Sequence, residues 1–90
     1  MGTRRVGRRG AALLQKARAT KADWTRTELD RLYKAFGFEL RHGSKHDVVV
    51  HPDHLDLRAT LTRSDPVAKG YIGKAVNLIE TLQDREKQGD

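Results

Sequence analysis

The sequence contains no cysteine among its 90 residues, which excludes disulfides and thiolate metal sites and favours a reducing, cytoplasmic location. No apolar run approaches the ~18–20 residues that a membrane span requires. The first ten residues, MGTRRVGRRG, lack the apolar stretch that follows the basic residues of an export signal. Aromatic residues make up only 6% of the chain and all hydrophobic residues 37%. We therefore expect one small domain with a modest core and no membrane partner.

Acidic residues are scarce at one end of the chain only. The formal net charge is +6, and four arginines stand in the first ten residues, which hold no acid. Residues 11–90 carry 14 basic and 12 acidic side chains, so their net charge is only +2. We predict a flexible basic arm at 1–10, which could attract nucleic acid or merely aid solubility. The single domain at 11–90 would then bind phosphate only through a local patch.

The spacing of apolar residues predicts three helices and three strands. The second helix has the clearest ends, because Thr25 and Glu28 have the spacing of a capping box and Gly37 suits the left-handed position after a helix. Its apolar face has the helical spacing of Leu29, Leu32, Tyr33 and Phe36. The other predicted elements are helices at 11–19 and 71–82, strands at 38–41, 46–50 and 57–63, and a polar, fraying end after residue 82.

Short links between consecutive strands predict an antiparallel meander. A three-stranded sheet has one face to bury, and the two longer amphipathic helices can cover it. The sequence therefore predicts an α+β two-layer sandwich, with a three-stranded antiparallel sheet, helices on one face and an extra N-terminal helix.

All four histidines fall within the thirteen residues HGSKHDVVVHPDH, which suggests a metal site, a catalytic imidazole, a pH switch or an accident of composition. A zinc site needs three or four ligands at fixed spacing, and this segment offers no cysteine and no helical His pair. The strand between His46 and His51 separates them by ~16 Å at ~3.3 Å per residue. We expect no metal site, with His42, His51 and His54 as turn and edge residues.

A general acid/base is chemically simpler than a protein nucleophile here. Ser44 lacks the flanking pattern of a nucleophile elbow. One imidazole beside an RNA phosphate can take the 2′-hydroxyl proton or protonate the leaving oxygen, because the RNA supplies its own nucleophile. Arg41 and Lys45 are nearby cations for the phosphate, and Gly43 is predicted to be a turn residue that tolerates positive φ and offers backbone amides. Ordinary surface histidines at strand ends are the alternative.

The segment LYKAFGFELRHGSKHDVVVHPD resembles the HicA family of bacterial toxins, small RNA-cleaving proteins of type II toxin–antitoxin systems. The similar features are an apolar helix ending in FGFEL, a Gly-Ser turn, a histidine that opens a strand, and HPD after it. LLQKARATKADWTRTEL and VAKGYIGKAVNLIETL resemble one branch of the family, so that the resemblance covers most of residues 12–83. The chain departs from the family in Lys45, an extra turn residue, in Val49, where an aromatic is frequent, and in an N-terminal extension that the shortest members lack.

The resemblance implies a fold similar to the double-stranded RNA-binding domain. It also implies an mRNA endoribonuclease that needs no metal or other cofactor and is held inactive by a HicB-type antitoxin. The catalytic histidine of the family stands five residues before a second histidine, which makes His46 the match. The start of the last helix would add lysines and anion-binding amides, although an ordinary solvated helix edge explains these lysines too. The RNA-binding residues expected on this basis are Arg41, Gly43, Ser44, Lys45, Lys69 and Lys74.

Two other functions stay open from the residues alone. A non-catalytic RNA-binding module of the same fold would read A-form shape and bind in a salt-sensitive way without cleavage. An interaction protein would instead dock a partner on the sheet face that carries Arg58, Thr60 and Thr62. Incubation with labelled RNA in EDTA separates metal-independent cleavage from binding alone.

Overall fold

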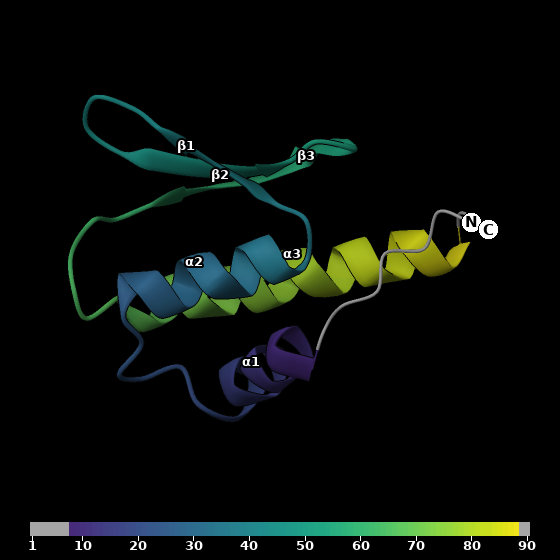
Figure 1. Cartoon of the computed structure of the whole chain (residues 1–90), viewed down its shortest axis with the longest axis horizontal. Coiled ribbons are helices and arrows are strands. Elements are labelled where there is room, and N and C mark those ends of the chain that lie inside the picture. Colours follow the sequence, from purple (N-terminus) through teal and green to yellow (C-terminus); the bar gives the residue numbers. More distant parts are fainter. Residues whose placement is uncertain (1–7, 89–90) are drawn as a thin grey trace.

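The computed structural model describes residues 8–88 as three helices and one three-stranded sheet (Figure 1). The strands are antiparallel and adjacent in the order β1-β2-β3, as the short links predicted. Within these residues, no helix has both the length and the apolar character needed to cross a membrane. The elements are α1 (Arg8–Ala19), α2 (Arg26–Ala35), β1 (Glu39–His42), β2 (Asp47–His51), β3 (His54–Leu61) and α3 (Lys69–Gln88).

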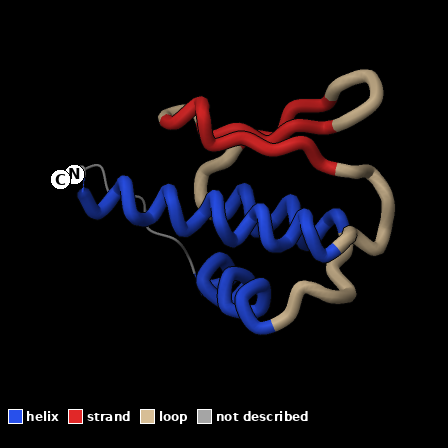
Figure 2. The backbone as a smooth tube through the Cα atoms, turned by 180° about the vertical axis from the view of Figure 1, so that it is seen from behind, coloured by secondary structure: helices blue, strands red, loops and turns tan. Residues whose placement is uncertain are grey.

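The sheet forms one layer and the helices form the other. α2 and α3 lie side by side against one face of the sheet, with α2 contacting β1 and α3 contacting β3. α1 packs on the side of these two helices that faces away from the sheet (Figure 2). The predicted α+β sandwich with an extra N-terminal helix is thus confirmed. The opposite face of the sheet has no helix of the described chain against it.

α2 begins and ends where local sequence signals place it. The Thr25 side chain accepts from the Glu28 amide, and the Glu28 carboxylate accepts from the Thr25 amide, both at 3.1 Å. A cap of this kind contributes ~1 kcal/mol. Trp24 and Leu29, on either side of the cap, are fully buried and form its hydrophobic staple. Gly37 has φ 89°, the left-handed conformation that ends the helix and directs the chain into β1.

The core lies between the sheet and the helices and continues between α1 and the other two helices. Trp24 belongs to this core and is held in place by two contacts. The Trp24 indole donates to the Thr20 carbonyl at 3.0 Å, and the Trp24 backbone pairs with Val67 in the β3–α3 loop. The Lys16 ammonium lies 4.8 Å from the centre of the same ring. Other core side chains are Leu14, Ala17, Leu29, Leu32, Tyr33, Phe36, Phe38, Val49, Leu57, Leu61, Ile72, Ala75, Leu78, Ile79 and Leu82.

Several element boundaries differ from those predicted. α1 begins at Arg8, inside the segment assigned to the arm, because Gly10, Leu14 and Ala17 share one buried helix face; the rest of that segment lies outside the described residues. α3 continues past residue 82 to Gln88 as a regular helix, so the predicted fraying does not begin there. The link between the second and third strands is shorter than the gap predicted at residues 51–56, because residues 52 and 53 alone make the turn and β3 already begins at His54.

Candidate functional site

The turn between β1 and β2 lies at one end of the sheet (Figure 1). The Gly43 amide donates to the His46 carbonyl at 2.9 Å, which leaves Ser44 and Lys45 as the tip of the hairpin. A Cβ on Gly43 would lie 2.6 Å from that same carbonyl oxygen. Among the glycines of residues 8–88, only Gly37 has a positive φ. Gly43 is thus a turn residue as predicted, but its φ is not positive; a side chain is disfavoured there because the His46 carbonyl lies too close.

Asp47, the first residue of β2, is 3% exposed and lies beneath this turn. One carboxylate oxygen accepts from Arg63 at 2.9 Å, and the other lies 2.8 Å from the Arg26 guanidinium. The hydrogen bonds from Arg63 and the charge of Arg26 hold the pKa of Asp47 well below its usual range, although burial acts in the opposite direction. The carboxylate is therefore ionised at neutral pH.

The two arginines connect this carboxylate to three other parts of the fold. Arg63 also donates to the Gly43 carbonyl and so clamps the two sides of the turn. Arg26, in the first turn of α2, donates to the Thr62 carbonyl at 2.9 Å and pairs with Asp30 at 2.7 Å. The hairpin turn is thereby held to the start of α2 and to the end of β3. These contacts therefore hold the backbone of the turn in place.

His42, the last residue of β1, is the imidazole that this network orients. It is paired across the strands with Asp47, and its Nδ1 lies 3.1 Å from the Asp47 carboxylate. The side chain is otherwise 72% exposed. A carboxylate at Nδ1 favours the tautomer with its proton on that atom, which leaves Nε2 as a base directed away from Asp47. Sequence reasoning missed this pair, although Asp47 has the same strand parity as the buried Val49, and a charge on a buried strand face requires a partner.

His46 stands on the other side of the hairpin tip, immediately before β2. Its side chain is exposed and makes no hydrogen bond or ion pair with any part of the described chain, and the same holds for Lys45. Arg41 is exposed, and its one ion pair within residues 8–88 is a long contact, 3.6 Å, with Glu39. Lys45, the extra residue of the turn, is accommodated in the hairpin tip between the hydrogen-bonded Gly43 and His46. The exposed turn thus offers an imidazole and cations that are free to meet a ligand.

The other two histidines are at the opposite end of the sheet. His51 is 1% exposed and packs edge-to-face on Phe38, with ring centres 5.2 Å apart. It also lies 5.2 Å from the ring of His54 and accepts from the Asp53 amide at 3.1 Å. The prediction that His51 is an edge or turn residue is therefore wrong: its ring fills the core beside Phe38. The four histidines form two separate pairs rather than one cluster.

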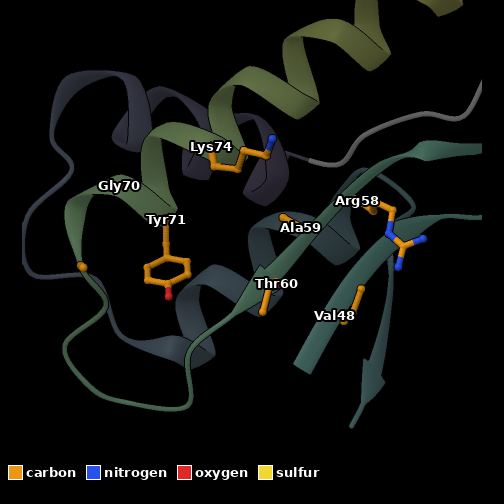
Figure 3. Close-up of a pocket in the computed structure, with 8 residues that line it drawn as sticks. Val48, Arg58, Ala59, Thr60, Gly70, Tyr71 and Lys74 are labelled. Atoms are coloured by element: carbon orange, nitrogen blue, oxygen red, sulfur yellow. The ribbon is translucent and has the colours of Figure 1, made fainter. Parts of the chain in front are cut away.

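Lys69 and Lys74 lie on α3, whose start reaches the same end of the molecule as the hairpin turn (Figure 1). Both side chains are exposed, and neither has a side-chain partner among residues 8–88. Lys74 lines a groove of about 550 Å³ between β3 and α3, into which Tyr71 also projects (Figure 3). The groove is lined by Val48, Arg58, Ala59, Thr60, Ala68, Gly70, Tyr71 and Lys74.

The outer face of the sheet is the surface that the sequence offers to a protein partner. Arg58 and Thr60 are exposed there, between the buried Leu57 and Leu61, as the alternation predicted. Thr62 lies beyond the end of β3, and its hydroxyl faces Ser64 at 3.3 Å. A smaller hollow of about 330 Å³ lies on this face and is lined by Arg41, His42, Gly43, Val48, Val50, Leu55 and Arg58.

Nothing in the described part of the chain brings three histidine, aspartate or glutamate side chains together in a way that could hold a metal ion. Comparison of the chain with known protein families, with curated proteins and with solved structures finds no match in any of the three.

Proposed function

We propose that this protein is a HicA-like mRNA endoribonuclease, the toxin of a toxin–antitoxin pair, with His46 as a general acid/base. The observation that carries the proposal is the pair of exposed imidazoles, His42 and His46, on a turn held by the buried Asp47. A positioned acid or base accelerates a reaction by ~10²–10⁴-fold. A turn whose backbone is held in place would help to position an imidazole in this way.

The proposed chemistry uses the nucleophile that RNA itself carries. One imidazole takes the proton of a 2′-hydroxyl, whose oxygen attacks the adjacent phosphorus, and a second proton goes to the departing 5′-oxygen. The products are a 2′,3′-cyclic phosphate and a 5′-hydroxyl. His42, whose Nε2 is left as a base by the Asp47 contact, suits the first transfer, and protonated His46 suits the second. Arg41 and Lys45 would stabilise the charge that builds up on the phosphate, and no step requires a metal ion.

The remaining unpaired cations extend the proposed RNA surface. Arg26, Arg63 and Arg85 are occupied by carboxylates, whereas Lys69 and Lys74 have no such partner in the described chain. Gly43 and Ser44 would contribute turn amides. A HicB-type antitoxin would inhibit the protein by covering the hairpin turn.

The test is cleavage of a 5′-labelled mRNA fragment in EDTA by the purified protein. We expect the wild type to leave 2′,3′-cyclic phosphate ends, and His46→Ala and His42→Ala each to lose activity by ~10²-fold or more. His54→Ala, which removes the same group at the other end of the sheet, serves as the matched control and should retain activity. Expression in cells without an antitoxin should arrest growth for the wild type and the control only.

Three results would contradict the proposal. Full activity of both His46→Ala and His42→Ala would show that the hairpin turn is not the active site. Salt-sensitive RNA binding without any product would leave an RNA-binding module. Cleavage that EDTA abolishes would instead show a metal-dependent reaction.

A further inference from the structure

The groove between β3 and α3 runs along an open edge of the sheet. β3 pairs with β2 on one side only, and it is eight residues long against four for β1. Every second residue of an edge strand directs its N–H and C=O groups away from the sheet. No hydrogen bond from the described residues reaches the outer side of β3 between residues 57 and 61. The groove therefore has a row of unused backbone donors and acceptors along one wall.

Small residues lie around the edge of β3, so a second polypeptide could approach the β3 backbone closely. Ala59 lies on the strand, Ala68 precedes α3 and Gly70 is in its first turn. A Cβ built on Gly70 would meet no atom within 4 Å, so the space there is open. Tyr71 projects from α3 into the groove that Thr60 of β3 also lines (Figure 3). This combination of strand edge and helix wall is the arrangement in which an extended peptide adds a strand to a sheet.

The charges that line the groove distinguish between three possible ligands: a second copy of the chain, RNA and an acidic polypeptide. Its lining contains Arg58 and Lys74, no acidic residue, and no ion pair with the described chain. A second copy of the chain, paired edge to edge, would bring Arg58 and Lys74 near their own equivalents and so oppose like charges. RNA would satisfy the two cations, but its phosphates cannot pair with the outward carbonyls of β3. An acidic polypeptide satisfies the cations, the amides and the carbonyls together.

We propose that this groove binds an extended, acidic segment of a partner protein, which pairs with β3 as a fourth strand. Five residues of β3, 57–61, offer an edge of ~17 Å at ~3.4 Å per residue, enough for a matching segment of similar length. The proposal goes beyond RNA cleavage, because it concerns a protein ligand in a groove that shares Lys74 alone with the proposed RNA surface. Since the segment would occupy Lys74, it would also compete with any RNA that uses this lysine.

The test selects the ligand without assuming its sequence. A phage-displayed library of random eight-residue peptides is panned against the full-length chain, and enriched peptides are synthesised with a fluorescent label. We expect β-branched residues alternating with aspartate or glutamate. Arg58→Glu and Lys74→Glu should each weaken binding about tenfold, measured by fluorescence anisotropy. Lys34→Glu, a charge reversal on the exposed side of α2, is the matched control and should bind as the wild type does.

Strand pairing is tested separately from charge. N-methylation of alternate peptide amides removes the donors while keeping every side chain, and in one of the two registers it should abolish binding. The bound peptide should also slow amide hydrogen exchange between residues 57 and 61. The proposal is overturned if no peptide is enriched, if binding survives N-methylation in both registers, or if a 12-nucleotide RNA protects these amides and peptides do not. Protection that appears only with rising protein concentration would show a dimer instead. None of these readouts depends on whether the chain cleaves RNA.

Discussion

The two ends of the sheet each carry a pair of histidines, but the environments differ sharply. At the β1–β2 turn, His42 and His46 are exposed above a buried, ionised carboxylate. At the β2–β3 turn, His51 is buried between Phe38 and His54. The same residue type therefore lies on the surface at one end and packs in the core at the other. Proximity in sequence does not bring the two pairs together, because β2, which ends at His51, spans the distance between the two ends.

The electrostatics of the two ends differ as well. Asp47 is enclosed by Arg26 and Arg63, whereas Asp56, beside the other turn, is 66% exposed although Arg85 holds both of its oxygens. The hydrogen bonds from Arg85 lower the pKa of Asp56 to about 2. Solvent screens an exposed pair of this kind, so it adds little to the free energy of unfolding. The enclosed network, in contrast, fixes the position of the hairpin turn.

The largest effect on stability should come from removing a histidine of the buried pair. His51→Ala removes a buried ring and should lower the free energy of unfolding by ~2–4 kcal/mol. His46→Ala removes an exposed ring and should change it by no more than ~0.5 kcal/mol. Urea denaturation followed by tryptophan fluorescence measures both, with Trp24 as the probe. Equal losses in the two variants would contradict the assignment of one end to packing and the other to the surface.

A smaller loss is expected when the hairpin turn itself is disturbed. The Cβ of Gly43→Ala would lie 2.6 Å from the His46 carbonyl, so the strands must separate at the turn. We expect a cost of ~1–3 kcal/mol in unfolding free energy, together with reduced RNA cleavage. Gly70→Ala is the control, because its Cβ would enter open space. An unchanged stability of Gly43→Ala would show that the turn is not constrained by this contact.

Lowering the pH should reduce the contributions of Asp47 and Asp56 to stability to different extents. The folded pKa of Asp47 is below its unfolded value of ~3.9, so the stability that its ionisation contributes is present at neutral pH. That contribution is lost as the pH falls from ~5 through the folded pKa. Asp47→Asn should therefore lower the melting temperature at pH 7 and flatten its decline between pH 5 and pH 3.

The control for this prediction is Asp56→Asn, at the other end of the sheet. Its folded pKa is also lowered, which gives the same sign, but its exposure makes the expected change the smallest of those described here. Thermal melts by circular dichroism across the pH range measure both variants. A larger effect for Asp56→Asn than for Asp47→Asn would reverse the comparison of the two ends.

Most of the fold could be predicted because its signals are local. Thr25 with Glu28 marks the start of α2, and Gly37 marks its end, since each acts on backbone groups within a few residues. The candidate site could be predicted only in part. Adjacency in sequence forces Lys45 and His46 onto one turn, whereas the contact of Arg63 with that turn has no local signal.

The sequence by itself determined the order of the elements, the alternation of β3 and the exposed position of the hairpin tip, because periodicity and turn composition act over short spans. Only the tertiary structure decided which histidines are oriented, exposed or buried. Arg26, Asp47 and Arg63 are far apart in the chain, and they meet because the start of α2 and the segment after β3 lie at the same end of the sheet as the start of β2. The same packing leaves the edge of β3 open beside α3. Such long-range contacts follow from how the layers fit together, which no short segment of this chain encodes.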